Sequence, residues 1–423
     1  MGEMLLQTHA QHRTPPGPRG DPATHRPDGD PDANAAPPHP ACRTAARGSR
    51  ELRSGGRRRP AGRAARATVD RPRHRTCRWR RGGGRDASDA PPTYHGRVDL
   101  ALLDSTLADL GQPAFRAKQV WEWASRGAAG YEEMTNLPAG LRDELAARVP
   151  FSTLELVREA HASDGTVKAL FRTQDGRLIE AVLMRYRDGR RSVCLSSQSG
   201  CPLTCTFCAT GTMKFGRNLS AGEILDQALH FRRIEPIDNV IFMGMGEPMM
   251  NLDNVLTTCE RLPDVGVAHR RQAISTVGWI PGIDRLAQQE RPIRLALSLH
   301  AADDALRSEI MPVNERYPLR DVLAACARFY ARKKRKIFVE YVMLEGVNDA
   351  PEQAVQLARV LDPKVYKVNL IPYNPTGSYD GSSREVIDVF RDTVEAHGVE
   401  ATVRLTRGRD IDAACGQLAA KSA

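Results

Sequence analysis

Strand-like and helix-like segments alternate regularly over residues 191–410, and this alternation constrains the fold more than any other feature. Among the helical stretches, Ser220–Arg233 has Ser220 as a plausible N-cap, and Asp321–Lys333 carries an apolar face. Six strand–helix units in a row predict a parallel sheet that is either curled or doubly wound. The expected strands are Ser192–Ser196, Asn239–Met243, Gln272–Val277, Ile293–Leu299, Lys336–Met343 and Tyr366–Ile371.

Three cysteines, Cys201, Cys205 and Cys208, lie within eight residues directly after the first expected strand. In a barrel-like sheet the reactive groups gather on the loops that follow the strands. Thiolates at this Cys-x3-Cys-x2-Cys spacing can hold three irons of a [4Fe–4S] cluster and leave the fourth iron open. Zinc is the competing interpretation, but a tetrahedral zinc site needs a fourth ligand, and no second cysteine pair or nearby histidine supplies one. The loop therefore favours a cluster with one open iron.

Residues 1–92 differ from the rest of the chain in charge and in apolar content. They hold 19 Arg and 9 acidic residues, a balance of +10 that equals the net charge of the whole chain. Large aliphatic side chains are sparse in this segment and absent from most of it. Such a segment cannot bury enough apolar surface to offset its chain entropy, so we expect it to be disordered. Residues 93–423 are then formally neutral.

Three explanations of this N-terminal segment compete. A solvated basic arm would attract RNA phosphates without sequence preference. Alternatively, translation begins near residue 90, because an Arg/Ala/Pro/Gly bias is what GC-rich DNA gives in an unselected frame. A targeting peptide is disfavoured, since Leu5-Leu6 is too short an apolar core and acidic residues are unusual in transit peptides.

Cellular location is constrained by apolar runs and by cysteine usage. No run of 18 apolar residues occurs, so we expect no membrane span. The nine cysteines are an odd number with three in one loop, which does not resemble a secreted disulfide framework. We therefore expect a cytoplasmic protein.

Two smaller units precede the alternating region. Apolar residues at helical spacing predict a helical module before residue 150, and short strands with Asp-Gly turns predict a β meander after it. The expected organisation is a disordered tail (1–92), a helical accessory domain (93–150), a β-rich connector (151–190), the main domain (191–410) and a C-terminal loop (411–423).

Glycine and polar residues follow several of the other expected strands. Gly244-Met245-Gly246-Glu247-Pro248 follows the second strand, where the glycines allow a ligand close to the backbone and the carboxylate can accept from an ammonium group. Any one of these residues is more often a turn residue with satisfied hydrogen bonds, but their shared position favours one pocket. The further candidates are Ser275 at the third strand, Ser298, Leu299 and His300 at the fourth, and Asn374 after the sixth.

The cysteine loop resembles that of the radical S-adenosylmethionine (SAM) superfamily, and further motifs resemble the RlmN/Cfr family within it. The resemblance covers residues 98–420 and implies an α/β fold, namely a partial (β/α)6 radical SAM barrel with a small N-terminal helical accessory domain and a short β meander. The motifs are Gly200–Gly211, Met243–Pro248, Ser298–Ala301, Asn369–Pro375 and Arg407–Leu418, with Phe115–Gln119 and Met134–Pro138 in the helical module.

The resemblance implies two cofactors and their ligands. A [4Fe–4S] cluster would be held by Cys201, Cys205 and Cys208, and its open iron would chelate the amino and carboxylate groups of SAM. An electron from the cluster would cleave SAM to methionine and a 5′-deoxyadenosyl radical, with flavodoxin or ferredoxin as the electron donor. The implied SAM contacts are Gly246, Glu247, Ser275, Ser298, Leu299, His300 and Asn374.

Three further residues match catalytic positions of the family. Cys415 matches the methyl-accepting cysteine: one SAM would methylate it, and a second would supply the radical that turns the methyl group into a methylene radical. That radical would add to the base and form a covalent protein–RNA adduct. Cys194 matches the cysteine that resolves the adduct, with a transient Cys194–Cys415 disulfide. Glu180 matches the proton acceptor, although the stretch from Glu180 to Cys194 is one residue longer here.

The implied activity is methylation of RNA by a monomeric enzyme, at C2 of adenine 2503 in 23S rRNA before ribosome assembly and of adenine 37 in tRNA. Methylation at C8, the Cfr-type reaction, is the closest alternative, and Pro248 after Glu247 favours C2. A zinc-stabilised, non-catalytic RNA-binding protein is an alternative of another class. Because residues 93–423 are formally neutral, we expect phosphate contacts from a local basic rim formed by Arg404, Arg407 and Arg409 with Lys333–Lys336.

Overall fold

The structure is a computed structural model that describes residues 100–420, so the expectations for residues 1–92 lie outside the described residues. Its main feature is a ten-stranded sheet in the order β1-β2-β3-β4-β7-β8-β9-β10-β11-β12. Strands β4 and β7 to β12 are parallel and follow one another in chain order, which confirms the expected α/β class. The parallel strands are β4 (Arg191–Leu195), β7 (Asn239–Phe242), β8 (Gln272–Thr276), β9 (Arg294–Ser298), β10 (Ile337–Met343), β11 (Tyr366–Pro372) and β12 (Ala401–Val403).

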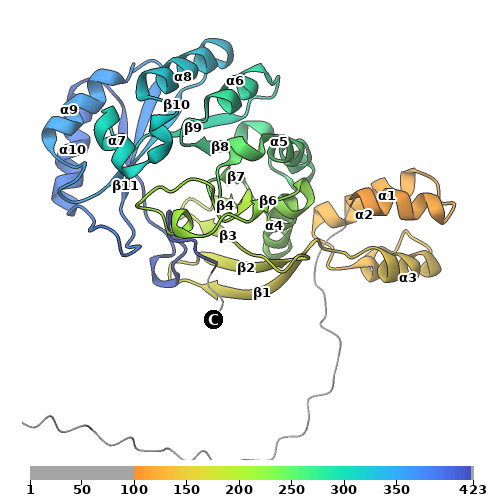
Figure 1. The fold of residues 1–423 in the computed structure, drawn as a ribbon. Helices are drawn as coiled ribbons and strands as arrows, with labels where there is room; N and C mark the ends of the chain where they lie inside the picture. Colours follow the sequence, from red (N-terminus) through yellow and green to blue (C-terminus); the bar gives the residue numbers. More distant parts are fainter. Residues whose placement is uncertain (1–99, 421–423) are drawn as a thin grey trace, which may run out of the picture. The chain divides into compact units, whose positions relative to one another are not determined.

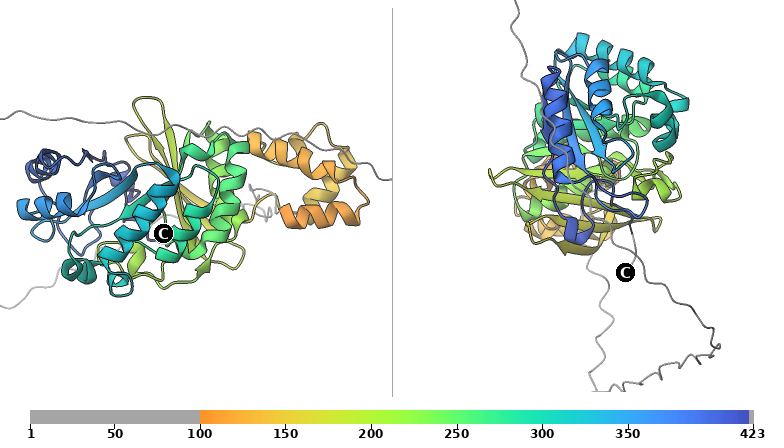
Figure 2. Two further views of the ribbon diagram at one scale, coloured as in Figure 1. Left: turned by 90° about the horizontal axis from the view of Figure 1, so that it is seen from above. Right: turned by 90° about the vertical axis from the view of Figure 1, so that its left-hand side faces the viewer.

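All six expected strands are present, with ends within one residue of the prediction. The short strand β12 was not predicted, because three residues carry too little alternation to be recognised. The helices between the strands lie along one face of the parallel strands (Figure 1 and Figure 2). The longer ones are α4 (Ala221–Ile234), α5 (Leu252–Arg261), α6 (Ile280–Gln288), α8 (Leu319–Lys333), α9 (Pro351–Val360) and α10 (Arg384–Ala396), and the short helix α7 (Asp304–Ile310) comes between β9 and α8. Helix α4 begins with the expected N-cap, since the Ser220 hydroxyl accepts from the Glu223 N–H and the Glu223 carboxylate accepts from the Ser220 N–H.

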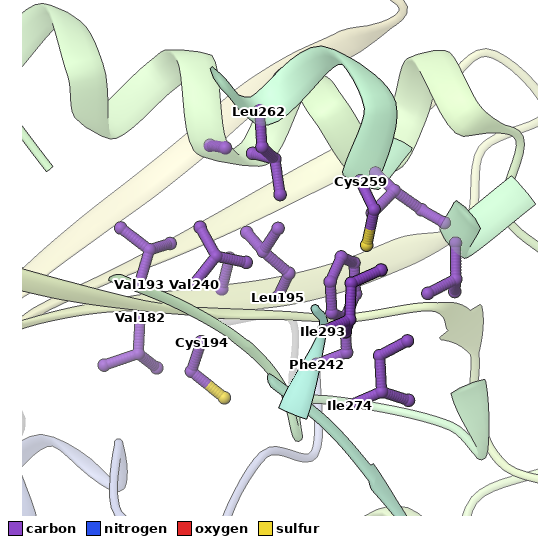
Figure 3. Packing of buried hydrophobic residues seen from close by; sticks show 14 of the residues in the cluster. Val182, Val193, Cys194, Leu195, Val240, Phe242, Cys259, Leu262, Ile274 and Ile293 are labelled. Atoms are coloured by element: carbon purple, nitrogen blue, oxygen red, sulfur yellow. The ribbon is translucent and has the colours of Figure 1, made fainter. Parts of the chain in front are cut away.

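The apolar core lies between this face of the sheet and the helices. In Figure 3, Val193 and Leu195 of β4 point toward Leu262 and Cys259 on the helical side, whereas Cys194 points to the opposite face. This alternation follows from the period of two in a β-strand. Cys259, and Cys326 on α8, are fully buried in the core. One strand thus contributes both to the core and to the inner face of the curled sheet.

The meander continues the same sheet rather than forming a separate one. Strands β1 (Leu154–His161), β2 (Val167–Thr173) and β3 (Leu178–Arg185) pair antiparallel, and β3 pairs antiparallel with β4. The register sets Val182 opposite Cys194. The border expected near residue 190 therefore runs between two hydrogen-bonded strands.

Before the sheet, three helices form a small module: α1 (Leu100–Asp109), α2 (Phe115–Arg126) and α3 (Ala139–Arg148), with the 3-10 helix η1 (Tyr131–Glu133). Its buried side chains include Leu103, Val120 and Leu145. The Trp121 indole N–H donates to the Asp264 carboxylate (2.8 Å), which lies in η4 (Leu262–Val265) after α5. None of the helices within residues 100–420 is long and apolar enough to cross a membrane.

Candidate functional site

The cysteine loop is closed at its base by a two-stranded ribbon, β5 (Gln198–Ser199) with β6 (Arg217–Asn218). Two glycines allow the loop to fold tightly between them. Gly200 has a φ of +74°, and a Cβ there would lie 2.5 Å from the Lys214 carbonyl oxygen. A Cβ on Gly211 would lie 2.6 Å from the Cys205 carbonyl oxygen. The backbone of the loop, rather than its side chains, therefore sets where the cysteines lie.

A cavity of about 930 Å³, its open mouth included, lies over the ends of the parallel strands. All three loop cysteines line it, together with most of the expected SAM contacts. Its lining includes Cys201, Cys205, Cys208, Gly246, Glu247, Ser275, Ser298, His300, Glu340 and Cys415. Thiols at one end and polar strand-end residues at the other fit an iron–sulfur cluster with a polar small molecule beside it.

Burial raises the pKa of each loop thiol, that of Cys201 to about 12. Neighbouring loop cysteines raise the pKa of Cys201 and Cys205 further, and Cys415 does so for Cys208. Thiols in such a place need nearby positive charge to become thiolates, and iron would supply that charge. Among residues 100–420, no three His, Cys, Asp or Glu side chains gather as the ligands of a single metal ion would. A cluster does not require such a gathering, because each cysteine binds a different iron.

The segment after β7 is tied to the segment after β4. The Met245 N–H donates to the Ser196 hydroxyl (2.8 Å), and the Glu247 N–H donates to the Gln198 side chain (2.8 Å). Gly246 has a φ of +98°, and a Cβ there would lie 2.5 Å from the Gln198 Cβ, so only glycine fits. Gly246 and Glu247 of the expected motif therefore both line the cavity.

Glu247 is buried, and its carboxylate accepts from two backbone N–H groups, those of Met249 and Val277, each at 3.0 Å. Burial nevertheless raises the pKa of Glu247 to about 7, and the two hydrogen bonds only reduce this effect. A cationic donor on a ligand would stabilise the ionised form of this buried carboxylate, so Glu247 favours a ligand with an ammonium group.

The expected contacts after β8 and β9 divide into two groups. The hydroxyls of Ser275 and Ser298 lie 3.3 Å apart and line the cavity. His300 also lines it, with Nδ1 accepting from the Val342 N–H (3.0 Å), and burial lowers its pKa to about 3, so the ring is neutral. Leu299 is different: its side chain is fully buried and does not line the cavity, and its backbone N–H donates to the Glu340 backbone carbonyl oxygen (3.0 Å).

Strand register adds a polar row that sequence reasoning missed. Ser298, Glu340, Asn369 and Thr402 are register partners on β9, β10, β11 and β12. The Asn369 amide donates to Glu340 (3.2 Å), and the Thr402 hydroxyl donates to the Asn369 side-chain oxygen (2.8 Å). The sequence signal was weak, namely isolated polar residues within mostly apolar strands, and strand register decides which of them lie side by side.

The C-terminal segment is bound to the cysteine loop. The Ala209 N–H donates to the Gly416 carbonyl oxygen (2.7 Å), and the Thr210 hydroxyl donates to the Leu418 carbonyl oxygen (2.6 Å). The Asn374 amide donates to the Cys415 carbonyl oxygen (3.2 Å), and its own Oδ1 is buried without a partner. An unpartnered buried acceptor is typical of a place that a ligand completes. These contacts bring Cys415, far away in sequence, to the cluster cysteines.

A second cavity of about 640 Å³ adjoins the first and is lined by both Cys194 and Cys415. The Cys415 thiol lies 4.0 Å from the Met243 sulfur, and the Arg404 guanidinium lies 3.3 Å from the same sulfur. Burial raises the pKa of Cys194 to about 12, and Cys415 raises it further. Cys415 lines both cavities, whereas Cys194 lines only the second.

Glu180 lies outside both of these cavities in this structure. Its buried carboxylate pairs with the Lys168 ammonium (3.0 Å) and accepts from the N–H groups of Ala419 (2.9 Å) and Ala420 (3.0 Å). The structure thus brings Glu180 to the C-terminal segment that carries Cys415, but it directs the carboxylate to that segment's backbone.

The expected basic rim is wrong as a single surface. Lys336 precedes β10 and pairs with Glu400 before β12 (3.5 Å), whereas Arg404 follows β12. Because these strands are parallel, Lys336 lies at their amino ends and Arg404 at their carboxyl ends, on opposite sides of the sheet's length. Arg404 also points inward to Glu340 (3.5 Å).

Arg307, which sequence reasoning did not single out, is fully buried and donates to the carbonyl oxygens of Val277 (2.6 Å) and Leu299 (3.2 Å).

Comparison with protein families agrees with this geometry. The model of the "Radical SAM superfamily" matches residues 195–358, and that of the "Ribosomal RNA large subunit methyltransferase N-terminal domain" matches residues 98–150. The superfamily uses a [4Fe–4S] cluster and SAM, and these are the cofactors of this chain. The zinc alternative is therefore not favoured.

Individual relatives cover most of the chain. It is 46% identical to the dual-specificity RNA methyltransferase RlmN of Anaeromyxobacter dehalogenans over 75% of this chain and 90% of the relative. It is 45% identical to the probable dual-specificity RNA methyltransferase RlmN of Salinispora tropica over 78% and 94%. The crystal structure of a radical SAM methyltransferase from Sphaerobacter thermophilus matches with a TM-score of 0.73 and 44% identity, covering 76% of this chain and 98% of that one. The chain therefore belongs to the RlmN family of radical SAM RNA methyltransferases.

Proposed function

We propose that this enzyme methylates C2 of adenine 2503 in 23S rRNA and of adenine 37 in tRNA, using two SAM molecules for each methyl group. The observation that carries the proposal is the position of Cys415, whose side chain lines both the cavity of the cluster cysteines and the cavity of Cys194. A methyl group on this sulfur has access to both spaces. The dual-specificity names of the relatives support two RNA substrates.

The bound cluster and SAM supply a 5′-deoxyadenosyl radical. In this proposal Cys201, Cys205 and Cys208 hold the cluster, and Gly246, Glu247, Ser275, Ser298, His300 and Asn374 surround SAM, with Leu299 contributing through its backbone. Cys415 accepts a methyl group and loses one hydrogen atom from it, and the methylene radical so formed bonds to the adenine C2. The adduct then loses the ring proton and one electron, which the oxidised cluster would take up. Cys194 attacks the Cys415 sulfur, the bond from this sulfur to the methylene carbon breaks, and that carbon takes a proton, which releases the methylated base and leaves a Cys194–Cys415 disulfide.

Glu180 is the proposed acceptor of the adenine-ring proton. Its carboxylate accepts from Ala419 and Ala420 in this structure, so this role requires the end of the C-terminal segment to move away when RNA binds. The target adenine must also leave its stack to reach the second cavity. A flavodoxin or ferredoxin as electron donor, a monomeric state and a cytoplasmic location complete the proposal.

Nucleoside analysis tests the regiochemistry. We expect 2-methyladenosine after anaerobic reaction of the cluster-loaded enzyme with SAM and protein-free rRNA or tRNA. Pro248 after Glu247 is the residue that favours C2 over the Cfr-type product. Formation of 8-methyladenosine as the sole product would contradict the proposal.

Two cysteine variants test the division of roles. The Cys205→Ala variant should lose most of its iron, and its rate of SAM cleavage should fall at least about a hundredfold. The control Cys259→Ala, which changes a core cysteine on α5, should keep both the iron and the rate. Cys194→Ala should accumulate protein covalently linked to RNA, seen as a band of reduced mobility that ribonuclease removes. Absence of this species in an otherwise active reaction would show that Cys194 does not resolve an adduct.

A further inference from the structure

Arg404 is a largely buried cation that lines the second cavity together with Cys194 and Cys415 and pairs with a carboxylate, and none of the roles above uses it. Its backbone N–H donates to the Leu370 carbonyl oxygen (2.7 Å), which fixes the residue directly after β12. The side chain then reaches back over β11 to Glu340 on β10, with 3.5 Å between guanidinium and carboxylate. The side chain of Arg404 is 19% exposed and that of Glu340 only 4%. An ion pair this deep contributes little net stability, because desolvation offsets the attraction.

The same guanidinium contacts the surroundings of the methyl-accepting thiol. Its NH1 atom lies 3.3 Å from the Met243 sulfur, and the Cys415 sulfur lies 4.0 Å from that same atom. One methionine sulfur therefore joins the cation and the thiol.

The other arginine that lines this cavity is directed elsewhere. Arg407 lies over the Tyr186 ring, 5.5 Å from its centroid, and its NH1 lies 3.7 Å from the Asp164 carboxylate. Arg404 has its own anchor, since Asn369 and Thr402 hold Glu340 in the polar row across β10, β11 and β12. Of the two arginines that line this cavity, Arg404 is therefore the one held beside the Met243 sulfur that Cys415 also contacts.

We propose that Arg404 is a positioning residue that stabilises the Cys415 thiolate while this sulfur takes the methyl group from SAM. The inference rests on the proposed role of Cys415. The thiol proton first leaves to solvent. The Cys415 sulfur then forms a bond to the methyl carbon, the bond from that carbon to the SAM sulfonium breaks, and its electron pair stays on the departing S-adenosylhomocysteine. One negative and one positive charge are neutralised together, so the step is balanced without a further reactant.

A cation beside a thiol has two opposing effects on this step. It increases the ionised fraction about tenfold for each pKa unit, but it weakens the nucleophile with a Brønsted slope of roughly 0.4–0.5. The gain in thiolate is larger than the loss in nucleophilicity as long as most of the thiol is protonated. Removing the charge should therefore slow attack on any electrophile, and a lysine, which keeps the charge without the planar fork, should restore part of the rate.

Two reactions of the cluster-loaded, full-length protein test this without RNA. One is methylation of Cys415 by SAM, and the other is its alkylation by iodoacetamide at pH 7.5, each followed by peptide mass spectrometry. For Arg404→Gln we expect both rates to fall at least about tenfold. For Arg404→Lys we expect a smaller fall, of about threefold, because the charge is kept. The control Arg409→Gln, an exposed residue of the same segment, should match the unmodified protein in both.

The outcomes separate this inference from the proposed function. If the unmodified protein gains no methyl group on Cys415, the proposed function fails. If it is methylated and Arg404→Gln reacts at the same rate, Arg404 has no such role. If Arg404→Gln loses iron or fails to fold, Arg404→Lys and a second charge-free variant, Arg404→Met, decide: faster alkylation of the lysine variant than of the methionine variant supports the inference. Equal loss in the lysine and charge-free variants overturns it, because shape rather than charge would then matter.

Discussion

Glu247 is a single carboxyl whose burial should make the stability of the enzyme depend on pH. Its pKa is raised from 4.5 to about 7, so between these values the folded protein binds more protons than the unfolded chain. The free energy of unfolding should therefore decrease as pH rises from about 4.5 to 7, and Glu247→Gln should remove this decrease. Denaturant unfolding of the cluster-free protein at several pH values measures the difference between the two proteins.

The matched control is Glu155→Gln, which changes a more exposed carboxylate paired with Arg172 on the neighbouring strand. Its difference from the unmodified protein gives the effect of losing a surface carboxylate, with which the Glu247→Gln difference is compared at each pH. A Glu247→Gln difference that does not change over this pH range would show that Glu247 is already ionised well below pH 7 in the folded protein.

Among the elements, the cysteine loop depends on close backbone packing at Gly211. In Gly211→Ala the new methyl group would meet the Cys205 carbonyl oxygen at 2.6 Å, so the loop must shift. We expect the reconstituted protein to hold less than about half the normal iron, since cluster binding needs all three cysteines in place. Gly140→Ala in α3 is the control, because no atom lies within 4 Å of its added Cβ, and its iron content should be unchanged. Normal iron in Gly211→Ala would mean that the loop adapts.

The end of the C-terminal segment depends on Glu180. Replacement by alanine removes the acceptor of the Ala419 and Ala420 N–H groups and leaves Lys168 without its carboxylate partner. Each hydrogen bond to a charged group contributes about 1.5–3 kcal/mol, so these amides should exchange with solvent at least about tenfold faster. Hydrogen exchange read by mass spectrometry of the C-terminal peptide measures this. If protection in this peptide does not change in Glu180→Ala, the carboxylate does not hold the segment.

At the scale of the whole molecule, the hydrogen bond between Trp121 and Asp264 links the helical module to the barrel. Asp264→Ala removes the acceptor of the Trp121 indole N–H without changing the module itself. The loss is about 1 kcal/mol, so amides in α1 to α3 should exchange roughly fivefold faster while those of the parallel strands stay unchanged. Asp253→Ala, an exposed change on α5 that breaks only its pair with Arg285, is the control and should leave the module unaffected. Equal exchange in the two variants would mean that other contacts hold the module.

Much of the fold followed from the sequence because its signals are local. Alternating apolar patterns located the six strands to within one residue, and Ser220 marked the start of α4 as its N-cap. The cysteine spacing pointed to the cluster for the same reason, since three ligands on one loop need no tertiary information. Strand β12 was missed because three residues hold too short a pattern.

The sequence by itself determined the class of fold, the cluster loop and the family, since each of these shows as a pattern within short contiguous segments. Only the tertiary structure decided which distant residues meet. It places Cys415 next to the loop that carries Cys208, and it pairs Arg404 with Glu340 instead of leaving it on a basic rim. It also makes Glu180 the acceptor of backbone N–H groups in the C-terminal segment. These contacts depend on strand register and on hydrogen bonds between segments up to 240 residues apart, and no local pattern specifies either.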